Sequence, residues 1–222
     1  MYNLPYFKET NKAVVFQFLN DYPFAFLTGS YQNGEQVATQ VPMLLEEREG
    51  ELYLQGHIMR NTDHHRAFAD NPQVLAVFTG PNTYVSASWY SNPQIGSTWN
   101  YMSVHIKGKI QFLSVDELIS LMKKFTLKFE NNDVSSPTIY DNLPETFLEK
   151  MLPAIVGFEI KVEKMENIFK LSQNRDEKSY RNIIAHLEKQ GGNSLQIAHE
   201  MKKRLDILFP EGVEWDGSKF MS

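Results

Sequence analysis

The stretch that says most about the fold runs from Gly80 to Gly108 and reads GPNTYVSASWYSNPQIGSTWNYMSVHIKG. It holds two of the three tryptophans of the chain, Trp89 and Trp99, and its other residues are rich in tyrosine, serine, asparagine and threonine. Large aromatic side chains beside hydroxyl and amide groups form the kind of wall that a flat ligand with polar edges requires. A loop that is simply held in place by its tryptophans is the alternative interpretation.

The end of this stretch enters the most regular strand pattern in the sequence. From Met102 to Phe112 apolar residues alternate with polar ones, which predicts a β-strand with one face in a core. Upstream, Phe24–Ser30 and Gln36–Leu45 are expected to be strands, and Asn33-Gly34 between them is a strong hairpin signal. Pro42 indicates that the second of these strands lies at an edge or carries a bulge.

The remaining segments complete a mainly β pattern. Further strands are expected at Glu51–His57, Gln73–Gly80 and Ile155–Val162. Short helices are expected at about 10–20, 62–69 and 144–153, and Ser114 with Glu117 forms a capping box for a longer helix. Hairpins and short helices connect the strands without a regular βαβ alternation. The pattern therefore favours an antiparallel barrel with peripheral helices over a doubly wound sheet.

The C-terminal part of the chain has a different character. Asp176–Gln190 and Asn193–Phe209 have the apolar spacing of two helices, joined by Gly191-Gly192. We therefore expect a barrel domain over residues 1–174 and a C-terminal helical extension over residues 175–222 that packs on the barrel.

This helical pair is also open to interpretation as a DNA-binding helix-turn-helix. Lys202, Lys203 and Arg204 form a small basic cluster in its second helix. Adjacent helical residues spread around the helix axis, however, and the net charge of the chain is -5. The basic footprint of a DNA-binding protein is missing, so a helical pair packed on the barrel is the favoured interpretation.

Composition limits the remaining classes. The 222 residues, 42% of them hydrophobic and 22% charged, are ordinary for a soluble globular protein. The chain has no cysteine, which excludes disulfides, thiolate metal sites and a cysteine nucleophile. Its first residues, MYNLPYFKETNK, lack the regions of a signal peptide, and no apolar run has the length of a membrane span. A cytoplasmic location is expected.

Common catalytic and phosphate-binding motifs are missing. The sequence has no G-x-x-x-x-G-K, G-x-G-x-x-G, G-x-S-x-G or H-E-x-x-H motif. His57, His64 and His65 are close in sequence, but adjacent residues on a helix point about 100° apart. We therefore predict no metal site there.

An anion site is suggested by QGHIMRNTDHHRAF, where an expected strand is followed by a polar loop and a helix N-terminus. Unpaired amides and the helix dipole favour negative charge at such a point. His57, Arg60, Asn61 and Thr62 would supply side-chain donors. In the alternative interpretation, Asn61 or Thr62 only caps the helix and Arg60 is solvated.

Several short motifs follow one another along the chain in a characteristic order and spacing. They are YPFAFLTGS, VATQVPMLL, LYLQGHIMRNTDHHRAF, Gly80-Pro81, Tyr84-Val85-Ser86, Ser88-Trp89-Tyr90, Thr98-Trp99-Asn100-Tyr101, Val104-His105 and KLSQNR at Lys170–Arg175. In these motifs the chain resembles the PaiB-like family of FMN-binding split barrels, a negative transcriptional regulator family related to pyridoxamine-phosphate oxidases and flavin reductases. Gln40 stands where the family usually has histidine, and Ala87 where it often has proline.

The resemblance implies a six-stranded antiparallel split barrel and a homodimer with FMN at its interface. It implies that the cofactor-binding residues are Thr39, Gln40, Val41, Gly56, His57, Met59, Arg60, Asn61, Thr98, Trp99 and Asn100. Trp99 is then expected to pack against the flavin ring or to cover it.

Three functions remain open at this point. The first is a flavoprotein, with an FMN-dependent oxidoreductase activity or a flavin-linked role in transcriptional regulation. The second is a DNA-binding negative regulator without catalytic activity. The third is a haem-binding split barrel in which His57, His64, His65 or His186 ligates iron. No residue stands out as a general acid or base, and His105 is the best candidate.

Overall fold

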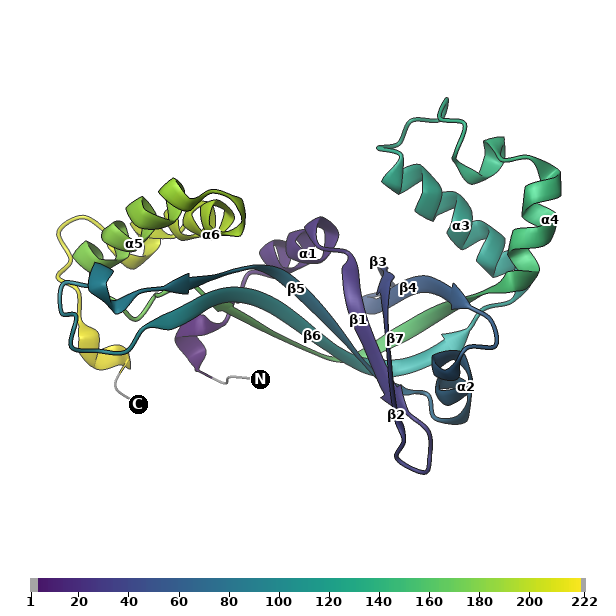
Figure 1. The fold of residues 1–222 in the computed structure, drawn as a ribbon, viewed down its shortest axis with the longest axis horizontal. Helices are drawn as coiled ribbons and strands as arrows, with labels where there is room; N and C mark the ends of the chain where they lie inside the picture. Colours follow the sequence, from purple (N-terminus) through teal and green to yellow (C-terminus); the bar gives the residue numbers. More distant parts are fainter. Residues whose placement is uncertain (1–3, 221–222) are drawn as a thin grey trace. The chain divides into compact units, whose positions relative to one another are not determined.

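The computed structural model describes residues 4–220 of the chain (Figure 1). The strands of this part are β1 (Phe24–Ser30), β2 (Gln36–Pro42), β3 (Leu44–Arg48), β4 (Glu51–Met59), β5 (Gln73–Val85), β6 (Thr98–Phe112) and β7 (Ile155–Lys170). Its α-helices are α1 (Lys12–Asp21), α2 (Asp63–Asp70), α3 (Val115–Phe129), α4 (Glu145–Ala154), α5 (Glu177–Gln190), α6 (Gly192–Lys202) and α7 (Leu205–Leu208). A short 3-10 helix, η2 (Ala87–Trp89), follows β5.

The chain folds into two compact units, each assembled from separate segments. Within the described residues, the first unit contains residues 4–15, Thr79–Val104 and residues 166–220, and the second contains Phe16–Phe78 and His105–Met165. Strands β5, β6 and β7 therefore each contribute residues to both units. This grouping cuts across the expected boundary at residue 174, and the division into a barrel and a C-terminal extension stays a prediction.

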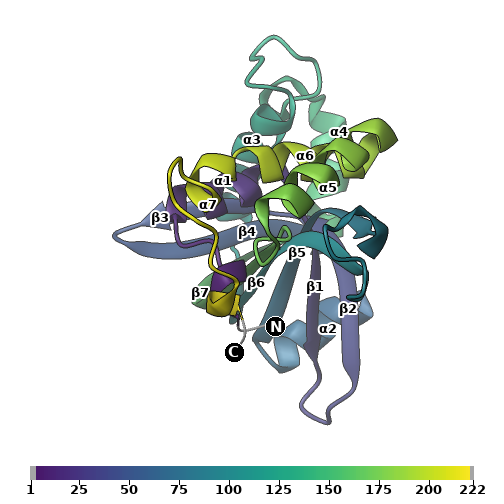
Figure 2. The same ribbon diagram turned by 90° about the vertical axis from the view of Figure 1, so that its left-hand side faces the viewer.

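The strands form one sheet in the order β2-β1-β5-β6-β7-β4-β3. β1 pairs antiparallel with β2 and with β5, and β4 pairs antiparallel with β3 and with β7. Figure 2 shows the β1–β2 hairpin, and α2 contacts both of its strands. The predicted fold class, a mainly antiparallel split barrel with peripheral helices, is confirmed.

The strand count differs from the expected six because one predicted strand is divided. Gln36–Leu45 contains the whole of β2 and the start of β3, with Met43 between the two strands. Pro42 is the last residue of β2, and proline has no N–H with which to extend a ladder. β2 lies at one edge of the sheet, as the proline predicted.

The capping motif predicted the start of α3 correctly, whereas one helix that the sequence predicted as continuous is divided in the structure. The Ser114–Glu117 capping box is present at the N-terminus of α3. The expected helix Asn193–Phe209, however, is two helices, because the turn at Lys203 and Arg204 separates α6 from α7. There the backbone N–H of Arg204 bonds the carbonyl of Met201 at 3.1 Å, a shorter-range bond than the α-helical pattern.

In the second unit, β6 and β7 approach each other very closely at Gly108. A Cβ atom added to this residue would lie 2.1 Å from the carbonyl oxygen of Lys161 and 2.9 Å from a methyl group of Ile160. Only glycine fits between these strands without moving the backbone.

In the first unit, α5 packs against α6, and their buried residues include Tyr180, Ile183, Leu187, Ile197 and Met201. The hydroxyl of Tyr180 satisfies its hydrogen bond inside this core by donating to the carbonyl of Met201 at 3.0 Å. The helical pair is therefore built around an apolar seam with one satisfied polar group.

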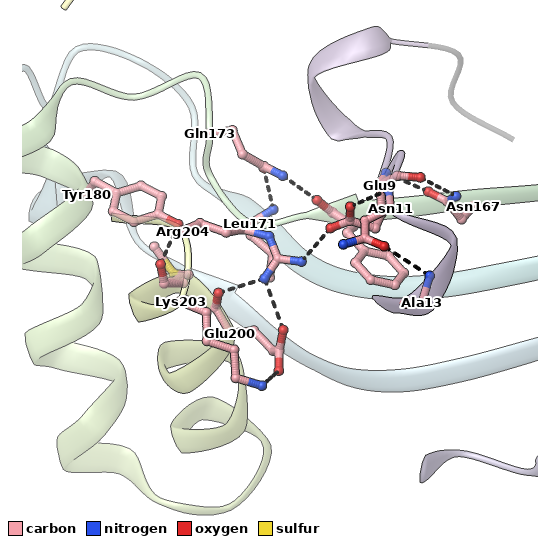
Figure 3. A network of polar contacts seen from close by, with 12 residues as sticks. Glu9, Asn11, Ala13, Asn167, Leu171, Gln173, Tyr180, Glu200, Lys203 and Arg204 are labelled. Carbon is pink, nitrogen blue, oxygen red and sulfur yellow. Dashed lines mark hydrogen bonds and ion pairs between the residues drawn. The ribbon is translucent and has the colours of Figure 1, made fainter. Parts of the chain in front are cut away.

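A polar network ties the N-terminal segment of the first unit to the C-terminal helices (Figure 3). Arg204 donates to the carboxylates of Glu9 and Glu200, each at 3.0 Å. Asn167, in β7, pairs with the backbone of Glu9 by accepting from its N–H at 2.8 Å and donating to its carbonyl at 2.9 Å. The side chain of Arg204 is only 13% exposed, so this pairing is largely shielded from water.

The charge of Glu200 depends on this network. Burial alone would raise the pKa of Glu200, but hydrogen bonds from Lys203 and Arg204 hold its pKa below the ordinary value of 4.5. A carboxyl group with a lowered pKa in the folded state contributes stability above its unfolded pKa, and this contribution is lost as the pH falls through the folded pKa.

We expect Gly108→Ala to lower the free energy of unfolding by roughly 1–3 kcal/mol, the usual cost of forcing an extra group into a packed site. Urea unfolding of the two proteins measures the difference. Gly96→Ala is the matched control, because a Cβ atom there meets no atom within 4 Å. Equal losses in the two variants would show that the close approach at Gly108 does not constrain the fold.

We expect Arg204→Met to destabilise the protein at pH 7 by roughly 1–3 kcal/mol, because it removes the cation paired with Glu9 and one of the two cations paired with Glu200. Lys202→Met, which removes an exposed ion pair to Glu188, should cost less than about 1 kcal/mol. The difference between Arg204→Met and the wild type should narrow as the pH falls from 4.5 through the lowered pKa of Glu200, because the Glu200 carboxylate of the folded wild type is then protonated. Urea unfolding at pH 7 and pH 3.5 tests this, and a gap that does not narrow at low pH contradicts it.

Candidate functional site

Eight of the eleven predicted cofactor-binding residues belong to the second unit. The first three lie on β2, where Thr39 pairs with Leu27 and Gln40 pairs with Phe26 of β1. Gln40 is exposed, Thr39 is half-buried and Val41 is buried. Since successive side chains of a strand point to opposite faces, Gln40 lies on the opposite face from Thr39 and Val41. A ligand on one face of β2 therefore meets either the amide of Gln40 or the other two side chains.

The position of β2 adds a further kind of donor. β2 is at an edge of the sheet, so only one of its sides has a neighbouring strand. Backbone N–H and C=O groups on the outer side of an edge strand remain open to a ligand. Main-chain groups of successive residues alternate between the two sides of the strand, so some of residues 39–41, but not all three, are able to offer main-chain hydrogen bonds to a ligand at this edge.

The next two predicted residues lie on β4. A Cβ atom added to Gly56 would meet the ring of Phe158 at 2.8 Å and the carbonyl oxygen of Pro42 at 3.1 Å. Gly56 is thus required for packing, and it brings β4 next to the end of β2. These two strands also contact each other as elements.

His57 is half-buried and its environment is apolar. Its ring meets the ring of Phe125 of α3 edge to face, with centroids 5.4 Å apart. Its Nδ1 atom is buried and has no hydrogen-bond partner in the described part of the chain. Burial lowers the pKa of His57 below its ordinary value of 6.5, so the neutral ring is favoured at pH 7. A neutral imidazole with an unpartnered nitrogen is able to donate to or accept from a ligand.

The remaining three predicted residues are Met59, which is the last residue of β4, and Arg60 and Asn61 in the loop that follows; all three are exposed. Arg60 is held firmly despite its exposure. Its backbone N–H donates to Ala154 at 2.9 Å, its Nε to the carbonyl of Pro153 at 3.2 Å and one Nη to the carbonyl of Ile155 at 2.9 Å. Carbonyl partners leave the positive charge of the guanidinium uncompensated, and its other N–H groups remain available to an anion.

The N-terminus of α2 is already capped. The hydroxyl of Thr62 accepts from the N–H of His65 at 3.3 Å, and the carboxylate of Asp63 accepts from the N–H of His64 at 2.7 Å. Nδ1 of His65 in turn accepts from the N–H of Asn61 at 3.0 Å. The interpretation of Thr62 as the cap is therefore correct. These amides bond side chains of the chain, so Arg60 rather than the helix terminus is the better anion donor.

The other three predicted residues, Thr98, Trp99 and Asn100, begin β6 in the first unit. Thr98 accepts a hydrogen bond from the ammonium group of Lys170 at 2.5 Å. Trp99 is 55% exposed, and its ring lies edge-on to that of Tyr84 with centroids 6.1 Å apart. Trp99 and Tyr84 therefore form an exposed aromatic pair, consistent with the predicted wall.

Asn100 has a different setting from its neighbours. It is fully buried, its Oδ1 accepts from Ser172 at 3.0 Å and its Nδ2 points to the sulfur of Met201 at 3.7 Å. Both ends of the amide are thus engaged within the first unit. This arrangement joins the start of β6 to the KLSQNR segment and to α6, a connection that the sequence pattern did not reveal.

The KLSQNR segment also contains two residues that the sequence analysis did not single out as ligands. Lys170 and Arg175 are both half-buried cations, and Arg175 lies over the ring of Tyr90. KLSQNR and Ser-Trp-Tyr are both among the motifs of the family resemblance, and this was the signal in the sequence that could have pointed to these two residues.

The other histidines do not form a metal site. Within residues 4–220, no group of three or more histidine, aspartate or glutamate side chains is arranged to hold a metal ion. His64 contacts Asp63 at 3.0 Å, and His186 stacks on Trp89 with centroids 4.8 Å apart. In the same part of the chain, no helix is both long enough and apolar enough to cross a membrane.

Solved structures share this fold at low sequence identity. The FAD and heme binding protein from Mycobacterium smegmatis has a TM-score of 0.56 and 17% identity, covering 74% of this chain and 73% of its own. The flavocytochrome Anf3 from Azotobacter vinelandii has a TM-score of 0.55 and 14% identity, covering 76% and 72%. At these identities the similarity establishes the fold alone.

Sequence comparison is more specific. The chain is 36% identical over 206 residues to the Bacillus subtilis "Protease synthase and sporulation protein PAI 2", and the match spans 92% of this chain and 98% of that protein. The family model described as "Putative FMN-binding domain" matches residues 1–164. The predicted family and its cofactor, FMN, are thereby confirmed, and the chain belongs to this FMN-binding family.

Proposed function

We propose that the protein is a flavoprotein that holds FMN with residues of β2, β4 and the following loop, and that its activity depends on the bound flavin. The observation that carries this proposal is the setting of Arg60. Its guanidinium is fixed by carbonyls and is exposed, and no carboxylate within residues 4–220 is paired with it. A fixed, uncompensated guanidinium suits the phosphate of FMN.

The other donors suit the remaining parts of this cofactor. The exposed amide of Gln40 and the open edge of β2 offer hydrogen bonds to the polar edge of a flavin ring or to its ribityl chain. The neutral ring of His57 offers one more polar atom. The residues present therefore fit FMN, and FMN when bound supplies the electron transfer. The chain's own residues bind and orient the cofactor.

The proposal includes a homodimer, and the outer face of the β1–β2–β5 sheet supports it. Phe24 is 55% exposed and Phe26 is 45% exposed on this face, next to the half-buried Val77 of β5. Contiguous exposed apolar groups of this kind mark interaction surfaces. Gln40 is the partner of Phe26 in the ladder, so a second copy on this face would also lie next to a cofactor-binding residue.

Direct DNA binding by the C-terminal helices is less well supported. Lys202 is paired with Glu188, Lys203 with Glu200, and Arg204 with both Glu200 and Glu9. DNA phosphates would have to displace these carboxylates before the cations could bind them. The relative from Bacillus subtilis is named for protease synthesis and sporulation. We propose that any regulatory role of the present chain acts through its flavin or through protein partners.

We expect Arg60→Ala to weaken FMN binding by about tenfold or more, because a charge-assisted hydrogen bond contributes roughly 1.5–3 kcal/mol. Affinity for riboflavin, which lacks the phosphate, should be unchanged. Flavin absorbance and fluorescence titrations of the purified protein measure both values. Arg66→Ala on α2 is the control with the same charge change. Equal FMN affinity in Arg60→Ala and the wild type would move the phosphate elsewhere, and a Soret band that persists with haemin but no retained FMN would favour haem.

We expect Phe26→Glu to convert a dimer into a monomer and to reduce FMN retention, because a charge on the apolar face opposes its burial. Sedimentation velocity with absorbance at the protein and flavin wavelengths reports both effects. Phe147→Glu, at a residue of α4 that is 50% exposed, introduces the same charge elsewhere in the second unit and should leave the dimer intact. A dimer that survives Phe26→Glu would place the interface on another surface.

A further inference from the structure

The first unit contains two neighbouring polar atoms that are buried and unsatisfied. They are the hydroxyl oxygen of Tyr90 and the Nε atom of Arg175. Tyr90 is only 5% exposed, and the guanidinium carbon of Arg175 lies 4.5 Å from the centroid of its ring. A buried polar group without a partner costs about 1–3 kcal/mol. Two such groups in contact point to a ligand that would satisfy both.

The charge at this point is positive and is not neutralised by the chain. Among residues 4–220, no carboxylate forms an ion pair with Arg175. The next residue, Asp176, is occupied as the N-cap of α5 and accepts from Ser91 at 2.8 Å and from Ser179 at 2.7 Å. A half-buried guanidinium with a buried Nε atom and no paired anion is unfavourable by itself, so the site is suited to a negatively charged group.

A second cation, Lys170, lies close enough to Arg175 for the two positive charges to interact. Burial, and then the positive charge of Arg175, lower the pKa of Lys170 below its ordinary value of 10.5. Lys170 donates to the hydroxyl of Thr98 at 2.5 Å. An anion bound at Arg175 would offset the repulsion between these two cations, which strengthens the preference for negative charge.

The groups around this point are held in place. The backbone N–H of Ser91 donates to Ser179 at 2.8 Å, which fixes the chain directly after Tyr90 on α5. The preceding residue, Trp89, stacks on His186 of α5 with an angle of 12° between the rings. The backbone N–H of Arg175 donates to the carbonyl of Ser172 at 3.0 Å. The donors are therefore preorganised, and binding need not order a mobile loop.

We propose that Arg175 and Tyr90 form a second ligand site, which binds the phosphate group of a small molecule other than FMN. A guanidinium matches the oxygens of a phosphate with parallel N–H donors, and a tyrosine hydroxyl adds one more donor. The cationic surroundings exclude a metal ion as the occupant. Neither Arg175 nor Tyr90 belongs to β2, β4 or the following loop, the segments proposed to hold FMN, so this site goes beyond the proposed FMN site.

The test uses the full-length protein as purified and inorganic phosphate as the probe, at constant ionic strength with chloride as the reference anion. Trp89 lies beside the site, so tryptophan fluorescence and the thermal unfolding midpoint both report binding. We expect a saturable phosphate response and a raised midpoint in the wild type. Arg175→Gln should weaken phosphate binding at least tenfold, and Tyr90→Phe should weaken it several-fold.

Arg181→Gln is the matched control, because this arginine is also in the α5 region but is exposed and paired with Glu177 at 2.7 Å. It should bind phosphate as the wild type does. Tyr90→Phe also guards against misfolding as an explanation, since removing an unpartnered buried hydroxyl should not lower the unfolding midpoint without phosphate. If phosphate does not bind saturably, or binds Arg175→Gln as tightly as the wild type, the proposal is wrong.

Flavin titrations separate this site from the proposed FMN site. We expect Arg175→Gln to bind FMN and riboflavin as the wild type does, whereas Arg60→Ala loses affinity for FMN alone. If Arg175→Gln instead loses affinity for FMN but not for riboflavin, the phosphate belongs to the flavin and the second site is overturned. Failure of Arg60→Ala to affect FMN would count against the proposed cofactor site and leave the result for Arg175 unchanged.

Discussion

The close approach of β6 and β7 at Gly108 is the constraint on which the central strands depend. The Lys161 carbonyl occupies the space in which any side chain would begin. These two strands are neighbours in the sheet order β2-β1-β5-β6-β7-β4-β3, and with β5 they are the strands that enter both units. Residues of β6 are thus buried in the cores of both units. Met102 and Val104 are buried in the first unit, and Ile106 and Ile110 in the second.

Because these strands are long, each unit is closed by segments that are far apart in sequence. The first unit joins the N-terminal segment to α6 through Glu9 and Arg204 and joins β6 to KLSQNR through Asn100 and Ser172. Buried polar groups in such positions are fully paired, because an unpaired one would be costly. This pairing is what distinguishes Arg204, whose charge is neutralised inside the chain, from Arg60 and Arg175, whose charges are not.

That difference decides which cations are able to bind an anionic ligand. A cation with carboxylate partners stabilises the fold, and its charge is offset before any ligand arrives. A cation held by carbonyls or by an aromatic ring keeps its charge and its position. Arg60 and Arg175 both meet the second description, although neither stands out from its neighbours in the sequence. The basic run of Lys202, Lys203 and Arg204, by contrast, is conspicuous in the sequence, and in the structure all three cations form ion pairs with carboxylates.

The alternating pattern of Met102–Phe112, the hairpin at Asn33-Gly34 and the Ser114 capping box are local signals, and each gave the correct element. Local signals were less accurate for the points at which elements end. Gln36–Leu45 reads as one strand, yet the strand ends at Pro42, and Asn193–Phe209 reads as one helix, yet it turns at Arg204. The predicted site residues also differ in whether a ligand is able to reach them. Gln40, Arg60 and Trp99 are exposed, whereas Asn100 is buried against Ser172.

By itself, then, the sequence determined the mainly β fold, the family and its cofactor, because strand periodicity, turns and ordered motifs are written in neighbouring residues. Only the tertiary structure decided which charged and polar groups are free to bind a ligand. Whether Arg60, Arg175 or Arg204 is neutralised depends on which atoms reach its guanidinium from segments up to 195 positions away. Desolvation and pairing of that kind arise from packing, and no local pattern of residues records them.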